Sequence, residues 1–202
     1  MIRDDLSTKL IHLTRGDEYG DAANRFLNII YNAHIAGGNN SIRGGYRCVC
    51  FSEAPISKLA QVLSLSLDIP QGGMRYRPFG VMIDKRWLFA AGGRPVIYQP
   101  EAEYDQLPET HKYRHVRYEP PHIDWTWERE WRIRTDRLDL DSNTTTFLVP
   151  DRRWEEWFLE QHSRAVADNS ALLGIPIPDP VPWHFLVLSD LGVEIPNVPA
   201  PA

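Results

Sequence analysis

The chain has 202 residues, 43% of them hydrophobic and 11% aromatic, which is enough for the packed core of one domain. Its formal net charge of −5 excludes a global electrostatic attraction to nucleic acid. Neither a transmembrane-length apolar run nor a signal-peptide pattern is present, so we expect a cytoplasmic protein with no membrane partner. Cys48 and Cys50 are two residues apart, a spacing at which we expect no bridge between them and therefore reduced thiols. Without a second cysteine pair we expect no zinc site.

The N-terminal part of the sequence predicts a strand followed by a helix. Residues 10–16 form a short apolar segment that ends in polar residues and a glycine, which is typical of a strand. Apolar residues follow helical spacing over 21–36, where Asp21 is the predicted N-cap and Gly37 and Gly38 end the helix. Residues 37–45 then predict a flexible polar loop that could rearrange around a ligand or simply connect.

A second strand over 46–51 leads into a helix that we expect to continue to about residue 67. Ser52 can cap this helix, and Pro55 suits its first turn. A helix N-terminus carries free N–H groups and a partial positive charge, so the position is suited to a phosphate group.

The remaining elements predict an α+β fold with largely antiparallel pairing, because strands outnumber helices. We expect one domain over residues 1–192 and a proline-rich tail over 193–202 that cannot form a central strand. A long polar connection spans residues 99–122, and such a segment is usually functional or disordered. The predicted strands are 76–84, 94–98, 145–150 and 183–188, and the predicted helices are 85–91 and 151–167, the latter capped by Asp151.

The segment 125–134 concentrates charge and aromatic surface. As an extended strand it would place Glu128 and Glu130 on one face with Arg132 and Arg134, and Trp127, Trp131 and Ile133 on the other. Two neighbouring carboxylates repel each other unless a cation or ligand lies between them. The pattern therefore indicates either a solvated strand with ion pairs or a catalytic Glu-x-Glu.

The charge around this segment is uneven. Residues 112–137 contain seven Lys or Arg against five Asp or Glu, with His115 and His122 in addition. A local basic patch here could hold phosphates of a small ligand or polynucleotide, or it could simply neutralise the two glutamates.

The order of these segments resembles the ADP-ribosyltransferase fold, which has two packed, mostly antiparallel sheets with flanking helices. His12 within Ile-His-Leu-Thr resembles the first element of that family and the His-Ile-Thr of DarT-type DNA ADP-ribosyltransferase toxins. Phe51-Ser52-Glu53-Ala54-Pro55 resembles the second element, and Glu130 of Glu-x-Glu resembles the third. The phrase Trp-Glu-Arg-Glu-Trp-Arg is also similar to uncharacterised bacterial proteins of the AbiGi and DUF2971 type, which are associated with phage defence.

This resemblance implies an enzyme that moves ADP-ribose from NAD to a nucleic-acid or protein acceptor, or to water. Glu130 would stabilise the oxocarbenium-like transition state and bind the 2′-hydroxyl, and Glu128 would orient or deprotonate the acceptor. Residues 99–122 occupy the place of the target loop. No metal is implied, and a cognate toxin or antitoxin is a further implied partner.

The resemblance also implies a set of NAD-binding residues. His12 would hold the ribose, backbone groups at Leu13, next to Thr14, would grip the carboxamide, and Ser52 would orient Glu130. Arg15, or the helix after Ser52, would neutralise the pyrophosphate. Tyr46 either stacks on nicotinamide or belongs to the core.

Two hypotheses from other classes stay open on the sequence alone. The chain could be a non-catalytic binding module, such as an antitoxin or sensor, that kept the fold and lost the reaction. It could also bind nucleic acid through its aromatic and basic surface, although the acidic net charge weighs against that as the main role.

Overall fold

A computed structural model describes residues 7–40, 42–56, 58, 76–174, 183–193, 195 and 197–201. The protein mixes strands with few helices, as the predicted α+β class requires. The chain divides into two compact units, which are described separately. Unit 1 comprises Met1–His12, His34–Pro55 and Ile83–Leu140, and unit 2 comprises Leu13–Ala33, Ile56–Met82 and Asp141–Ala202.

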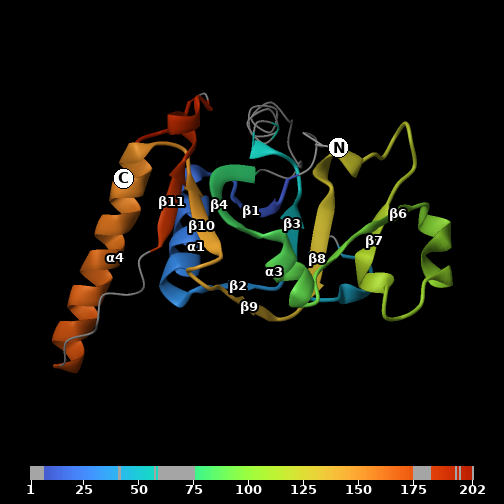
Figure 1. The fold of residues 1–202 in the computed structure, drawn as a ribbon, viewed down its shortest axis with the longest axis horizontal. Coiled ribbons are helices and arrows are strands. Elements are labelled where there is room, and N and C mark those ends of the chain that lie inside the picture. Colours follow the sequence, from blue (N-terminus) through green and yellow to red (C-terminus); the bar gives the residue numbers. More distant parts are fainter. Residues whose placement is uncertain are drawn as a thin grey trace. The chain divides into compact units, whose positions relative to one another are not determined.

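Unit 1 is built on a sheet with the strand order β1-β3-β8-β5 (Figure 1). β3 pairs antiparallel with β1 and β8, and β8 pairs antiparallel with β5. Two further pairs complete the unit, β2 antiparallel with β9 and β6 parallel with β7. The strands are β1 (Lys9–Arg15, to His12 in this unit), β2 (His34–Ala36), β3 (Cys48–Ser52), β5 (Arg94–Pro95), β6 (Ile97–Gln99), β7 (His115–Arg117), β8 (Glu130–Arg134) and β9 (Arg137–Asp139).

Short helical segments connect the strands of unit 1. The α-helix is α3 (Lys85–Ala90), and the 3-10 turns are η1 (Arg43–Gly45), η2 (Glu101–Gln106), η3 (Lys112–Arg114) and η4 (Thr126–Glu128). Asp84 caps α3 by accepting hydrogen bonds from the backbone N–H groups of Arg86 and Trp87. The expected helix after residue 84 is therefore confirmed.

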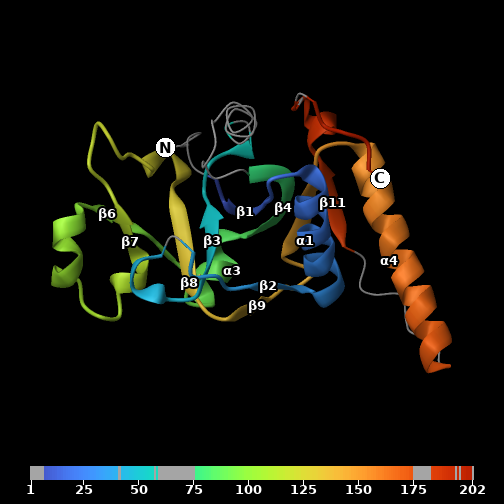
Figure 2. The ribbon, with the colours of Figure 1, turned by 180° about the vertical axis from the view of Figure 1, so that it is seen from behind.

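Unit 2 packs two helices with strands in the order β11-β10-β4-β1, as seen from the other side in Figure 2. Its elements are α1 (Tyr19–Asn32), β4 (Tyr76–Asp84, to Met82 in this unit), β10 (Thr145–Val149), α4 (Arg152–Leu173), β11 (His184–Val187) and η5 (Leu188–Leu191). β10 and β11 pair in parallel. Asp151 caps α4 by accepting from the N–H of Trp154, as predicted.

The core of unit 2 is aromatic. Phe26 of α1 contacts the rings of Phe79, Phe147 and Phe158 at centroid distances of 6.0, 5.4 and 5.0 Å. All four phenylalanines are fully buried, and Trp154 packs on Phe79 at 4.7 Å. The indole N–H of Trp154 donates to the Pro199 carbonyl at 2.9 Å, so this part of the proline-rich tail contacts α4.

Several predicted boundaries are wrong. The helix predicted over 21–36 starts at Tyr19 with Glu18 rather than Asp21 as N-cap, and it ends at Asn32. Residues 34–36 instead form β2, because pairing with β9 satisfies their backbone groups. The strand predicted over 94–98 is interrupted, giving β5 and β6.

The segment 99–122 is not a structureless connection. It contains η2, η3 and β7, and it buries Tyr104, Tyr113, His115 and Val116. The helix predicted after Ser52 lies mostly outside the described residues; within them, Ile56 and Lys58 are helical. No helix in the described part of the chain is both long and apolar enough to cross a membrane.

Candidate functional site

The candidate site is the face of β3 and β8 that carries Glu130. In the register of this pair, Glu130 lies opposite Ser52, Arg132 opposite Cys50, and Arg134 opposite Cys48. Directly opposed residues of antiparallel strands share a face. The predicted common face of Glu130, Arg132 and Arg134 is therefore confirmed.

The predicted position of Glu128 on this face is wrong, because β8 begins only at Glu130. Thr126–Glu128 form the 3-10 turn η4, and Arg129 follows in the left-handed region with φ 45°. Trp127 is 43% exposed in this turn, so it does not share an apolar face with Trp131 and Ile133. Glu128 and Glu130 are thus separated by a turn rather than aligned along a strand.

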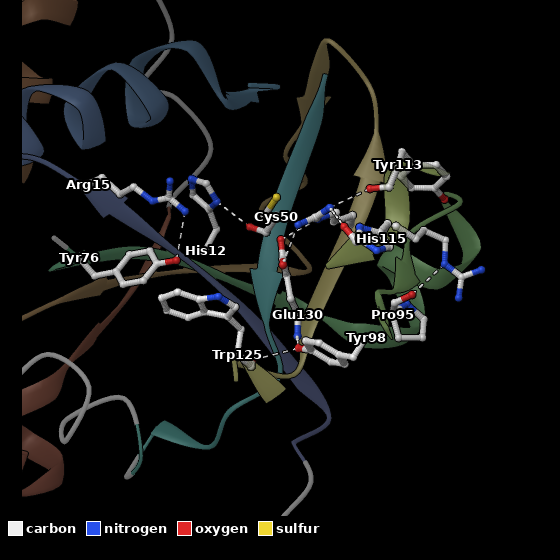
Figure 3. A network of polar contacts seen from close by, with 12 residues as sticks. His12, Arg15, Cys50, Tyr76, Pro95, Tyr98, Tyr113, His115, Trp125 and Glu130 are labelled. Carbon is white, nitrogen blue, oxygen red and sulfur yellow. Dashed lines mark hydrogen bonds and ion pairs between the residues drawn. The ribbon is translucent and has the colours of Figure 1, made fainter. Parts of the chain in front are cut away.

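Hydrogen bonds from outside the turn explain why the strand stops there. The Tyr98 hydroxyl donates to the Trp125 carbonyl at 3.2 Å and accepts from the Glu130 N–H at 3.1 Å, as Figure 3 shows. The Ser52 hydroxyl donates to the Glu128 carbonyl at 2.6 Å. These contacts satisfy backbone groups that an extended strand would have paired elsewhere.

The Glu130 carboxylate is held by Arg132 from the same strand. Arg132 Nε donates to Glu130 Oε1 at 2.8 Å and Nη2 donates to Oε2 at 3.0 Å. The side chain of Glu130 is only 12% exposed and that of Arg132 only 6%. A bidentate pair of this kind uses one acceptor position on each carboxylate oxygen, and the Cys50 thiol is a further hydrogen-bond partner of Glu130, so part of the acceptor capacity remains.

Arg132 is itself anchored to the neighbouring segment. Its Nη1 donates to the carbonyls of Tyr113 and His115, both at 2.9 Å. The guanidinium therefore connects β8 with η3 and β7 while it binds Glu130.

Burial shifts the pKa values of the groups around this pair. It raises the pKa of the Cys50 thiol, and the negative charge of Glu130 raises it further. Burial also raises the pKa of Cys48 to about 11 and that of the Tyr98 hydroxyl to about 12. Both cysteines are free, and their raised pKa values keep them protonated near neutral pH.

His12 lies on β1, the strand beside β3. One of its ring nitrogens, Nδ1, is 2.8 Å from the Cys50 carbonyl oxygen (Figure 3). The ring also meets Phe51 edge-on, with 5.8 Å between the ring centroids. The register pairs Ile11 with Ser52, so regular alternation assigns His12 to the row of Phe51 rather than to that of Ser52. The structure brings His12, Ser52 and Glu130 onto neighbouring strands, but this register does not put all three on one face.

The other residues expected to bind NAD have different surroundings. Leu13, Thr14 and Arg15 belong to unit 2, where the Thr14 hydroxyl donates to the Phe79 carbonyl at 3.0 Å and Arg15 donates to the Tyr76 hydroxyl at 3.2 Å. Leu13 is buried.

Tyr46 belongs to unit 1 and contacts groups at the periphery of that unit. Its hydroxyl donates to the Glu109 carboxylate, and the Arg134 guanidinium lies 4.7 Å from its ring centroid. Its ring also packs against the small cluster of Ile42, Cys48 and Tyr113. These contacts agree with a packing role for Tyr46.

Glu53 is a buried carboxylate that the sequence did not single out. Its two oxygens accept from Lys85 Nζ at 2.6 Å and from the Trp131 indole at 2.8 Å, and the residue is 8% exposed. The contacts link the end of β3 to α3 and β8. The only available signal was its place in Ser-Glu-Ala-Pro, since its partners are far away in sequence.

The described residues contain no cluster of three or more His, Cys, Asp or Glu side chains placed to hold a metal ion. Comparisons with protein-family models, with curated proteins and with solved structures found no match to this chain.

Proposed function

We propose that the protein is an NAD-dependent ADP-ribosyltransferase in which Glu130 is the catalytic carboxylate. The observation that carries the proposal is the position of Ser52 directly opposite Glu130, on a strand next to the one that bears His12. Three segments far apart in the sequence, which resemble the three motif strands of that family, thus become neighbours in the order β1-β3-β8. That the chain adopts the ADP-ribosyltransferase fold, with its two packed sheets, is part of the same proposal.

The proposed chemistry breaks the bond between nicotinamide and the ribose carbon. Nicotinamide leaves with the bonding electrons, and the ribose acquires oxocarbenium character. The Glu130 carboxylate lies against that charge and accepts a hydrogen bond from the 2′-hydroxyl, for which its oxygens keep acceptor positions. The acceptor hydroxyl, amine, base nitrogen or water then bonds to the ribose carbon and loses its proton to a base.

Glu128 is the proposed group for this proton transfer. It lies two residues before Glu130, at the end of the turn η4. Ser52 binds the backbone carbonyl of Glu128 rather than the side chain of Glu130. The segment 99–122, which contacts Arg132 through two carbonyls, is the proposed acceptor-facing region. With this function we propose a nucleic acid or a protein as the acceptor, and a cognate toxin or antitoxin as a further partner.

Incubation with NAD labelled in its adenylate part tests this function. We expect labelled ADP-ribose, free or attached to an acceptor, and Glu130→Gln should lower the rate by ~100- to 1000-fold. In Glu128→Gln, hydrolysis should persist while transfer falls. Asp139→Asn, which removes an exposed carboxylate of unit 1 outside residues 99–122, is the control and should keep the wild-type rate.

A second candidate function is a non-catalytic binding module of the same fold. It is favoured by His12, whose ring binds the Cys50 backbone in the row of Phe51, and by the Ser52 hydroxyl, which binds a backbone carbonyl. Both residues then serve the fold. If NAD binds saturably but no nicotinamide is released with any acceptor tested, the binding module is supported and the proposed ADP-ribosyltransferase activity is contradicted.

A further inference from the structure

Arg132 makes the two charged hydrogen bonds to the Glu130 carboxylate, which also has the neutral Cys50 thiol as a hydrogen-bond partner. We propose that Arg132, and not Ser52, is the positioning residue for Glu130. The inference rests on the proposed function for its catalytic consequence, but its structural part can be measured without any activity.

The geometry of the pair supports this role. Two parallel hydrogen bonds of 2.8 and 3.0 Å fix the plane of the carboxylate, which a single contact would leave free to rotate. With the side chains 6% and 12% exposed, water screens the pair weakly. The carboxylate is therefore held in one orientation before any substrate binds.

Arg132 is rigid because its own donors are bound on the other side. The Tyr113 and His115 carbonyls accept from the same Nη1, so the guanidinium is fixed by backbone atoms of the segment after η2. Rotation of the guanidinium would leave these carbonyls or the Glu130 oxygens without their charged donor, which is unfavourable for buried groups. Through Arg132, the backbone of residues 113–115 sets the orientation of Glu130.

Ser52 is excluded from this role by its contacts. Its hydroxyl hydrogen is donated to the Glu128 carbonyl at 2.6 Å, and its oxygen accepts from the Ala54 N–H at 3.1 Å. A hydroxyl has one hydrogen to donate, and here that hydrogen is used on the turn. Ser52 thus stabilises the backbone at Glu128, whereas Arg132 binds the side chain of Glu130.

Arg132→Lys tests the catalytic part of the proposal, with Arg134→Lys as the matched control. Lysine keeps the positive charge but cannot form the planar bidentate contact. Arg134 lies two residues further along β8 on the same face and is exposed, with its guanidinium over the Tyr46 ring. We expect kcat for NAD consumption to fall ~10- to 100-fold in Arg132→Lys while KM for NAD changes less than about twofold.

Arg134→Lys should leave both constants close to wild type. Wild-type kcat in Arg132→Lys, or an equal fall of kcat in the two variants, would overturn the proposal.

Proton exchange of the Arg132 Nε–H group, measured by NMR, tests the structural part in the folded wild-type chain. We expect slow exchange in the wild type and in Ser52→Ala, and at least about tenfold faster exchange in Glu130→Gln, because the charged acceptor is lost. Equal exchange in wild type and Glu130→Gln, or fast exchange in Ser52→Ala, would refute the role of Arg132.

The NMR measurement also decides the matter if Arg132→Lys does not fold. A wild-type chain that consumes no NAD contradicts the proposed function, whereas the exchange rates still decide whether Arg132 positions the carboxylate.

Discussion

Unit 1 and unit 2 bury different kinds of side chain. The core of unit 2 is a cluster of fully buried aromatic rings from α1, β4, β10 and α4, in which Phe26 stacks on Phe79 and meets Phe147 and Phe158 edge-on. Among the described residues, the charged side chains that are buried all belong to unit 1, and they are Glu53, Glu128 and Arg132. Buried charge is stabilising only when it is well paired, so a sequence that retains it invites a functional explanation. The comparison assigns the aromatic packing to unit 2 and the buried charges, on which the proposed chemistry depends, to unit 1.

The aromatic core should give the largest effect on stability. Phe158→Ala removes a fully buried ring that contacts Phe26 and Phe79, and it leaves a cavity. We expect the free energy of unfolding to fall by about 3–5 kcal/mol in urea denaturation. Leu159→Ala, the next residue of the same helix and 48% exposed, should have a much smaller effect. Equal effects would mean that Phe158 does not anchor α4 in the aromatic core of unit 2.

Glu130→Gln should give the largest effect in unit 1. Packing around the nearly isosteric side chain is preserved, but the buried Arg132 guanidinium loses its counter-charge. Removing one partner of a buried pair costs about 3–5 kcal/mol of stability. Asp139→Asn breaks an ion pair with Arg137 that is exposed on both sides, and its unfolding curve should nearly coincide with the wild type. If both variants unfold like the wild type, the charged network of unit 1 does not stabilise the fold.

The sequence predicted the strands and helices whose residues follow a clear period. β4 and β10 were expected at nearly their observed positions, because alternation reflects burial directly. α4 was expected with its observed N-cap, but it ends at Leu173 rather than at residue 167. For residues 125–129 the same reasoning gave a wrong prediction. Their pattern fits a strand, but the hydroxyls of Tyr98 and Ser52 bind the Trp125 and Glu128 carbonyls and hold a turn. Contacts over 27 and 76 residues of sequence leave no local signal.

The candidate site could be predicted only to the level of its strands. Ser52 and Glu130 are opposed across β3 and β8, and Arg132 shares the face of Glu130, as alternation requires. The partner of each side chain was not predictable in the same way. Which donor reaches the Glu130 carboxylate depends on backbone carbonyls of residues 113 and 115, whose place is set by tertiary packing.

The Cys50 thiol, which lies beside the buried charges of unit 1, should make the free energy of unfolding depend on pH. Burial, and then the charge of Glu130, raise the pKa of this thiol in the folded chain above its unfolded value of about 8.5. Above that pH the unfolded thiol loses its proton while the folded thiol keeps it, so the folded state loses stability as pH rises. One thiol contributes at most about 1.4 kcal/mol per pH unit.

The comparison of wild type with Cys50→Ala isolates this contribution between about pH 8.5 and 10. Urea denaturation across that range should show a steeper loss of stability in the wild type. Parallel pH profiles in the two proteins would show that the thiol is not held protonated beside Glu130.

Tyr98→Phe should give the smallest effect on stability and the most informative one on function. The change keeps the ring but removes the hydroxyl that donates to the Trp125 carbonyl and accepts from the Glu130 N–H. Losing these partly buried contacts should lower the free energy of unfolding by about 1 kcal/mol. Tyr46→Phe, which removes a hydrogen bond to the exposed Glu109, should change it less. Because the Tyr98 hydroxyl spans the turn that carries Glu128, while Arg132 still holds the Glu130 side chain, transfer to the acceptor should fall more than hydrolysis of NAD. An equal fall in both activities would mean that the turn and the carboxylate of Glu130 are positioned as one unit, and that Arg132 alone does not fix Glu130.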